Sequence, residues 1–243
     1  MRKTFLLLLA AAAIVPAMLA NQVQVGYPGS SYGPYQTGVG GEFTLNPLTG
    51  WLDLSGYVAD ETKDIGAKGT FQTFCVEGAE YIYPYATIYN ATLNTKAVWG
   101  SMPGTGDPIS VGTGWLYKQF ATGSWETGLS YDYSNPGRSG AGSSAYFLQR
   151  AIWWLEGEEG VNYSASNPYM AAVVAKFGSQ DNAKADGAWD YEVWALNLTN
   201  PSTGAVAQDQ LVYMHVVPDG GLTLMLLGLG LGGVGLVSRK LRK

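Results

Sequence analysis

The sequence predicts a mostly β fold, in the form of a single β-sandwich or barrel-like domain with a small helical insertion. Hydrophobic residues make up 47% of the chain and charged residues only 14%, so the chain can bury a core and is not a disordered polyelectrolyte. Short aromatic and β-branched runs alternate with Gly, Asn, Asp and Pro breaks, which is typical of strands joined by turns. Helical periodicity is confined mainly to the middle of the chain.

Five runs of residues predict strands. They lie at 51–58, 70–77, 81–89, 192–198 and 211–217. In the second run both faces of the alternating pattern are apolar, which indicates a buried strand at the centre of a sheet. Residues 22–41 are rich in Gly, Tyr, Pro and Ser, and we expect them to be irregular or to form an edge.

Two helices are predicted between the third and fourth strand runs. Ser143 or Ser144 can cap the first, whose apolar stripe ends near Gly157. The second spans 165–177, where an Asn-Pro pair supplies an N-cap and a first-turn proline and a glycine follows the last helical residue. Residues 115–120, with Trp99, predict a further short helical piece.

The two ends of the chain predict an export signal and a membrane segment. Residues 1–20 have the layout of a secretory signal peptide, with cleavage after Ala20 or, alternatively, after Ala17. Residues 222–237 carry no charge, and a basic stop follows them, which consists of Arg239, Lys240, Arg242 and Lys243. One secreted domain, 21–217, is therefore expected on the far side of the membrane.

The tail at 218–243, together with the residue before it, resembles a known class of sorting signal. A short motif precedes the uncharged segment and consists of Val217, Pro218, Asp219, Gly220 and Gly221. The tail has the motif, the apolar segment and the basic end in the same order as the VPDSG-type variant of the PEP-CTERM signals, and it resembles that variant. The difference is Gly221, where the variant usually has serine. The resemblance implies export across the inner membrane of a Gram-negative, exopolysaccharide-producing bacterium and processing by the membrane enzyme exosortase. The alternative is an ordinary single-pass anchor.

Charge and residue content exclude several functions. Residues 21–217 hold 8 of the 14 basic residues but 18 of the 19 acidic ones, so no nucleic-acid partner is expected. With one Cys and one His, at His215, the chain cannot build a Cys/His zinc site, and the acidic loop at 181–192 does not fit the calcium-loop template. We expect no cofactor and no metal.

Acidic residues follow two predicted elements, and a glycosidase would need two such carboxylates facing each other across a sugar. The acidic residues after the second predicted strand are Glu77 and Glu80, and those after the first predicted helix are Glu156, Glu158 and Glu159. Because the sequence does not place them face to face, we expect no enzyme.

The single cysteine, Cys75, is the most informative residue of the domain. Secreted proteins use cysteines in pairs, so a lone one indicates a reactive thiol, an intermolecular disulfide or a buried inert side chain. It lies in the sequence Thr-Phe-Cys-Val-Glu, and 74 residues later Gln149 lies in Leu-Gln-Arg-Ala-Ile-Trp.

These two motifs resemble those of the thioester domains of bacterial surface adhesins, with Leu148 where threonine is usual. The resemblance implies that Cys75 and Gln149 form an internal thioester, which reacts with amines or hydroxyls on a target surface. Covalent attachment at the cell surface or in the extracellular matrix is then the leading function. The alternatives are a thioester-like fold without the bond, serving as a non-covalent structural or polysaccharide-binding module of the exopolysaccharide matrix, and no relation to that family.

Overall fold

The computed structural model describes residues 21–26, 40–48, 51–52, 54, 57, 69–83, 85–98, 106–126, 128–133, 140–158 and 160–214. Several sequence predictions fall outside these ranges. They are the signal peptide 1–20, half of the run 51–58, Trp99, His215, the motif from Val217 to Gly221, the segment 222–237 and the basic stop from Arg239 to Lys243.

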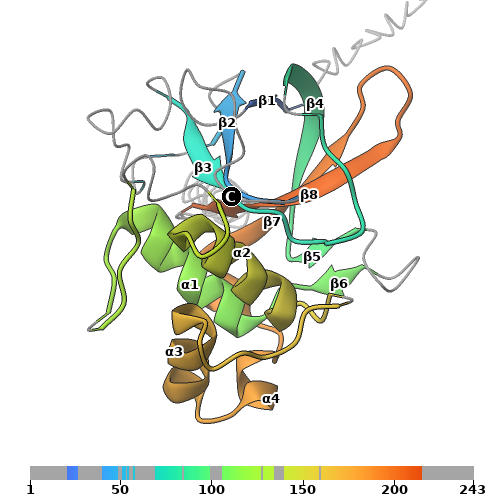
Figure 1. The fold of residues 1–243 in the computed structure, drawn as a ribbon. Coiled ribbons are helices and arrows are strands. Elements are labelled where there is room, and N and C mark those ends of the chain that lie inside the picture. The colour runs from blue at the N-terminus through green and yellow to red at the C-terminus, as the bar shows by residue number, and fades with distance from the viewer. Residues whose placement is uncertain are drawn as a thin grey trace, which may run out of the picture.

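A six-stranded antiparallel sheet forms the body of the protein, which confirms the prediction of a mostly β fold. Its strand order is β3-β2-β1-β4-β7-β8. The strands are β1 (Gln22–Gly26), β2 (Phe43–Pro47), β3 (Phe71–Thr73), β4 (Tyr85–Asn94), β7 (Val193–Thr199) and β8 (Val206–Tyr213). The sheet curls into a half-barrel, and a small pair of strands, β5 (Lys96–Ala97) and β6 (Asp107–Pro108), lies beside it (Figure 1).

The start of the domain differs from its prediction, because β1 lies inside the sheet between β2 and β4. Its sequence alternates Gln and Val, and the side chains of Val23 and Val25 are fully buried. This is the period of a strand with one face on the core. The Gly- and Tyr-rich residues that follow β1 dominate the composition of 22–41 and hide this short signal.

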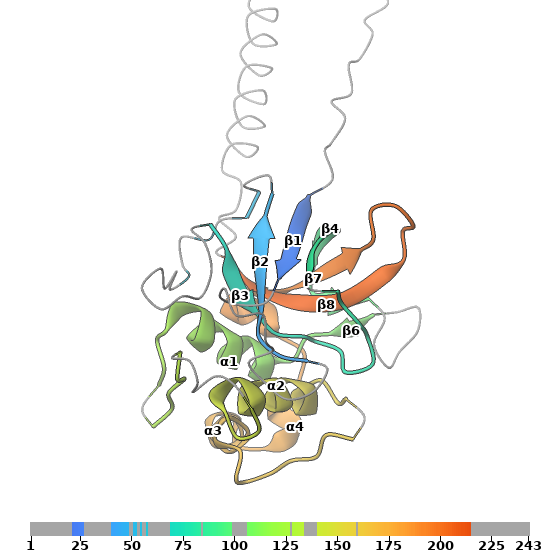
Figure 2. The same cartoon turned by 45° about the horizontal axis from the view of Figure 1, so that its top comes forward.

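The helices are inserted between β6 and β7 and gather on one side of the curled sheet (Figure 2). They are α1 (Val111–Thr122), α2 (Ser144–Leu155), α3 (Pro168–Phe177), α4 (Gln180–Ala183) and the 3₁₀ turn η1 (Ala188–Tyr191). Ser143 caps α2, and Asn167 caps α3, with Gly178 in the left-handed conformation at its end. Both helices are therefore confirmed, and α1 is longer than the predicted short piece.

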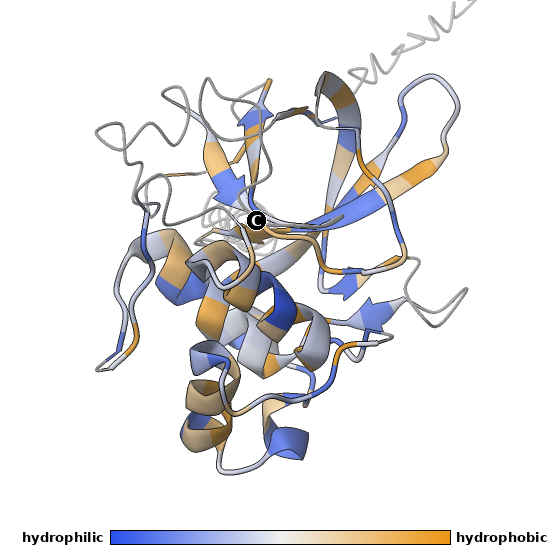
Figure 3. Cartoon of the chain, in the orientation of Figure 1, coloured by the Kyte–Doolittle hydropathy of each residue, from blue (hydrophilic) through white to orange (hydrophobic). Residues whose placement is uncertain are grey.

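Two apolar clusters share the core. The first joins α1, α2 and α3 to Phe74 and Val76, and the second consists mainly of strand residues such as Val25 and Leu196. Hydrophobic and hydrophilic residues alternate along several strands, as the colouring shows (Figure 3). Because side chains on a strand point alternately to its two faces, one sheet can contribute to both clusters.

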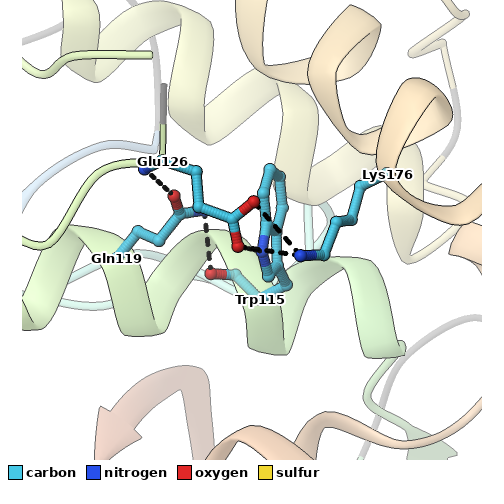
Figure 4. Close-up of polar contacts among 4 residues, drawn as sticks. All are labelled: Trp115, Gln119, Glu126 and Lys176. Atoms are coloured by element: carbon cyan, nitrogen blue, oxygen red, sulfur yellow. Dashed lines mark hydrogen bonds and ion pairs between the residues drawn. The ribbon is translucent and has the colours of Figure 1, made fainter. Parts of the chain in front are cut away.

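Glu126, in the loop after α1, connects α1 to α3. Its carboxylate accepts hydrogen bonds from Trp115 Nε1, at 2.9 Å, and from Lys176 Nζ, at 2.8 and 3.1 Å (Figure 4). Gln119 accepts from the backbone N–H of Glu126 at 2.6 Å. The Lys176 ammonium lowers the pKa of the Glu126 carboxyl, but both side chains are exposed and such pairs add little stability.

We predict that Gly114→Ala destabilises the fold. A Cβ at this position of α1 would lie 2.6 Å from Ala188 Cα and 2.9 Å from Ala188 O, both of them backbone atoms. Overpacking of this kind costs about 1–3 kcal/mol, and the free energy of unfolding in urea should fall by that amount. Gly26→Ala is the matched control, because a Cβ at that position would have nothing within 4 Å of it, and its change should be small. Equal effects of the two substitutions would contradict the packing argument.

Candidate functional site

Cys75 lies where the two ends of the curled sheet meet. Two residues beyond β3 it forms an isolated antiparallel bridge with Gln210 of β8. The bonds of this bridge are Val76 N–H to Asp209 O, at 3.0 Å, and Leu211 N–H to Phe74 O, at 3.2 Å. The run 70–77 was expected to be a strand at the centre of the sheet. This position is wrong, because β3 is the last strand in the order of the sheet. Its burial is confirmed, because β8 and the helices cover it.

Gln149 of α2 points directly at the backbone of Cys75. Its Oε1 accepts from Cys75 N–H at 3.0 Å, and its Nε2 donates to Cys75 O at 2.8 Å. Gly41 N–H also donates to Oε1, at 3.0 Å. The structure therefore brings together the two residues that the sequence motifs single out.

The sheet register explains why a side chain fits between these backbones. Strand β2 pairs with β3 so that Phe43 faces Thr73, and the same register continued by two residues sets Gly41 opposite Cys75. The pairing of β2 with β3 ends before this point, so Gly41 and Cys75 are not bonded to each other as strand partners. The carboxamide of Gln149 bonds to both backbones instead. Cys75 and Gln149 each have an exposed fraction of 0%, so no solvent reaches these bonds.

The thiol itself is held in an apolar, fully buried environment. Gln210 Nε2 lies 3.7 Å from Cys75 Sγ and is its side-chain hydrogen-bond donor. Burial raises the pKa of the Cys75 thiol to about 12, and the negative charge of Glu80 adds to this shift. At neutral pH the sulfur is therefore a protonated thiol, protected from reagents in solution.

The hydrogen bonds to Gln149 Oε1 have the arrangement of an oxyanion hole. Two backbone N–H groups, from Gly41 and Cys75, converge on one carbonyl oxygen in a fully buried site. Donors of this kind stabilise the negative charge that develops when a nucleophile attacks the attached carbon. The arrangement can thus polarise the Gln149 carboxamide toward attack by a neighbouring sulfur.

The remaining residues of the helix motif lie in the two cores. Ala151 and Ile152 are fully buried in the first cluster, as is Leu148, which replaces the usual threonine. Trp153 is partly buried and packs against the second cluster, to which Cys75 belongs. The motif therefore fixes α2 across both cores and directs Gln149 toward the junction of the sheet ends.

Two acidic side chains lie between the segment that follows Cys75 and the segment that follows α2. Glu77 and Glu158 are both buried, and Glu158 Oε2 accepts from Gly78 N–H at 2.7 Å. Each of the two carboxyls has an Oε1 without a hydrogen-bond partner. Burial, and then the neighbouring Glu158 carboxyl, raise the pKa of Glu77 well above its ordinary value. Glu77 therefore keeps its proton at neutral pH.

Glu156, the other acidic residue described at the end of α2, serves the fold. Its Oε1 accepts from Ser110 Oγ at 2.8 Å and from Thr113 Oγ1 at 2.5 Å, which fixes the start of α1. Burial raises its pKa to about 7, against the opposing effect of these donors. The carboxylate of Glu156 is therefore already bonded to Ser110 and Thr113 and is not free to act as one of a glycosidase's two carboxylates. Glu159 lies outside the described residues.

Sequence reasoning missed Gly41 and Gln210. Nothing near Gly41 in the chain marks it, because its role depends on the register of β2 against β3. For Gln210 there was a signal. The consecutive polar residues Gln208, Asp209 and Gln210 are at most 2% exposed, and buried polar runs in a strand indicate specific partners.

We predict that Gln149→Met lowers the free energy of unfolding by at least about 3 kcal/mol. The substitution leaves two N–H groups and one carbonyl unpaired in a buried site, at about 1–3 kcal/mol each. Urea unfolding of Gln149→Met in a Cys75→Ala background measures this loss in the absence of any crosslink. Gln180→Met is the control, because Gln180 is exposed, and it should change stability little. A similar small change at Gln149 would contradict the role of its hydrogen bonds.

We predict that the protein loses stability as the pH rises above about 5. A carboxyl whose pKa is raised by folding keeps a proton that the unfolded chain releases, so unfolding becomes more favourable with rising pH. Glu77 contributes most, and Glu158, Glu80 and Asp107 are the charged groups that act on it. Asp209 and Glu156, each with a pKa of about 7, shift stability in the same direction.

Urea unfolding between about pH 5 and about pH 9 measures this slope. Glu77→Gln should make it shallower, because the amide replaces the neutral carboxyl without its titration. Glu126→Gln is the control, because the pKa of this exposed carboxyl is lowered rather than raised. An unchanged slope in Glu77→Gln would show that Glu77 is ionised in the folded protein.

Within the described part of the chain, no three His, Cys, Asp or Glu side chains are grouped so that they could hold a metal ion. The helices of this part are also too short or too polar to cross a membrane. Comparisons with models of protein families, with curated proteins and with solved structures find no match to this chain.

Proposed function

We propose that the protein is an exported envelope or matrix protein that attaches covalently to a surface through an internal thioester between Cys75 and Gln149. One observation carries the proposal: the Gln149 carboxamide is held against Cys75, with its oxygen between two backbone N–H donors. The sequence motifs identify the same two residues independently of this geometry.

The chemistry needs no cofactor and no oxidant. Cys75 Sγ attacks Gln149 Cδ, and the negative charge that develops on Oε1 is stabilised by the N–H groups of Gly41 and Cys75. The thiol proton and the carboxamide nitrogen leave together as ammonia, and a C–S bond replaces the C–N bond. Because folding holds the Gln149 carboxamide against the backbone of Cys75, orientation would lower the barrier of an otherwise slow reaction.

Burial supports the second half of the proposed function, in which the thioester survives until it meets its target. Both residues are fully buried, so water does not reach the acyl carbon in the described arrangement. When contact with the target opens the site, an amine or hydroxyl attacks Cδ and the C–S bond breaks. The sulfur takes up the proton and leaves as the Cys75 thiol, and an amide or ester bond remains. Each molecule reacts once, so the process is attachment and not enzymatic turnover.

The route of export belongs to the same proposal. A signal peptide at 1–20 and a PEP-CTERM-like tail at 218–243, read by exosortase, would place the domain 21–217 in the envelope or the extracellular matrix. The basic stop after 222–237 would hold the tail in the inner membrane until that processing.

A non-covalent structural module is the second candidate, and one observation favours it. The three hydrogen bonds of Gln149 already satisfy the backbone of Cys75 and Gly41 without any covalent bond. The burial of Cys75, with its raised pKa, is also what an inert core thiol shows.

We predict that the purified protein is lighter by one ammonia than its sequence mass. Intact mass spectrometry measures this, with the mature ends determined by peptide mapping of the same sample. Cys75→Ala and Gln149→Ala should each have the full expected mass, because either removes one partner of the bond. Incubation with methylamine should add one methylamine to the wild-type protein at Gln149 and free the thiol. Full mass in the wild type, with Cys75 alkylated only after denaturation, would establish the structural module instead.

A further inference from the structure

A concave site lies on another side of α2, and neither Cys75 nor Gln149 lines it. It is a pocket of about 310 Å³, formed between the first turns of α2 and the segment that leads into α3. Its lining consists of Tyr146, Phe147, Arg150, Asn162, Ser164, Ser166, Asn167 and Met170. Asn162 and Ser166 are exposed, so the pocket is open to solvent.

The wall of this pocket is fixed by hydrogen bonds. Asn167 caps α3 by accepting from Tyr169 N–H at 3.0 Å, and its Nδ2 donates to Phe147 O at 2.8 Å. Ser164 N–H contacts Met170 Sδ at 3.3 Å. These bonds hold the segment before α3 against α2, so the pocket is preformed.

Arg150 supplies the positive charge of the pocket. Its guanidinium carbon lies 5.7 Å from the centre of the Tyr146 ring, which orients the side chain. Lys118 and Lys176 form ion pairs with Glu192 and Glu126, whereas Arg150 has no ion pair among the described residues. Lys184 also has no ion pair among the described residues, but its ammonium lies over the ring of Trp154, whereas the charge of Arg150 lines the pocket.

The other polar groups of the pocket suit a ligand with hydroxyls. Ser164 Oγ and Ser166 Oγ lie 2.8 Å apart and share one hydrogen bond, so each hydroxyl keeps further bonding capacity. The exposed Asn162 side chain has no hydrogen bond among the described residues, and its amide can both donate and accept. A single guanidinium matches one carboxylate in a bidentate pair, and the neutral groups match hydroxyls around it.

We propose that this pocket binds a uronic-acid unit of an acidic polysaccharide. Arg150 pairs with the sugar carboxylate, and Asn162, Ser164 and Ser166 bond the ring hydroxyls. This site goes beyond the proposed thioester and does not depend on it, because binding here is reversible and uses a different side of α2.

Titration calorimetry of the full chain tests the site with a trimer of glucuronic acid as the probe. We expect saturable binding that is weakened by salt, with at least about tenfold lower affinity in Arg150→Met. Asn162→Ala should weaken the binding of the trimer as well, because it removes a hydroxyl partner and leaves the charge. Lys184→Met is the matched control, because Lys184 is a cation over the ring of Trp154 of α2 and lines no part of the pocket.

Three results would overturn the inference. If a glucose trimer bound as tightly as the glucuronic acid trimer, Arg150 would not be recognising a carboxylate. Equal affinity for acetate or inorganic phosphate would make the pocket a general anion site, and unchanged binding in Arg150→Met would place the trimer elsewhere. Cys75→Ala should bind the trimer as the wild type does, so failure of the thioester and failure of this site are distinguished.

Discussion

The carboxamide of Gln149, inserted between Cys75 and Gly41, is the interaction on which the arrangement of sheet and helices depends. The bridge between Cys75 and Gln210 is a non-hydrogen-bonded pair, because its bonds run through the residues on either side. The N–H and C=O of Cys75 therefore point away from β8, toward the space that β2 leaves. Without Gln149 these groups would be buried and unpaired, and α2 would have no polar connection to this point of the sheet.

The same geometry would serve both the stability of the fold and the proposed thioester chemistry, and the two roles are compatible. Loss of ammonia from Gln149 would remove only the hydrogen bond from Nε2 to Cys75 O. The two bonds to Oε1 would remain, because a thioester keeps its carbonyl oxygen. A reaction at this site would thus preserve most of the polar contacts that position α2, and a new covalent bond would replace the one that is lost.

The parts of the fold that follow local rules could be predicted from the sequence. Both predicted helix starts, at Ser143 and Asn167, depend on a capping side chain that lies within three residues of its partner. β1 was missed because two valines are too short a signal beside a Gly-rich segment. The adjacency of Cys75 and Gln149 came from a motif resemblance, whereas Gly41 and Gln210 depend on strand register and on the curl of the sheet. Long-range register of this kind leaves no pattern in a single sequence.

Electrostatics divides the surroundings of α2 into two environments. Glu80 raises the pKa of the Cys75 thiol, and Glu80 and Glu158 raise the pKa of Glu77, so further negative charge is disfavoured in the site. An anionic ligand would be repelled there, so a neutral amine or hydroxyl is the nucleophile that this site favours. Arg150 follows Gln149 directly, but successive residues of a helix point about 100° apart. Gln149 therefore reaches into the buried junction of the sheet ends, near Glu80, while Arg150 presents its charge in an open pocket. One helix can in this way retain an acidic polymer on its outer side without admitting its carboxylates to the buried carboxamide.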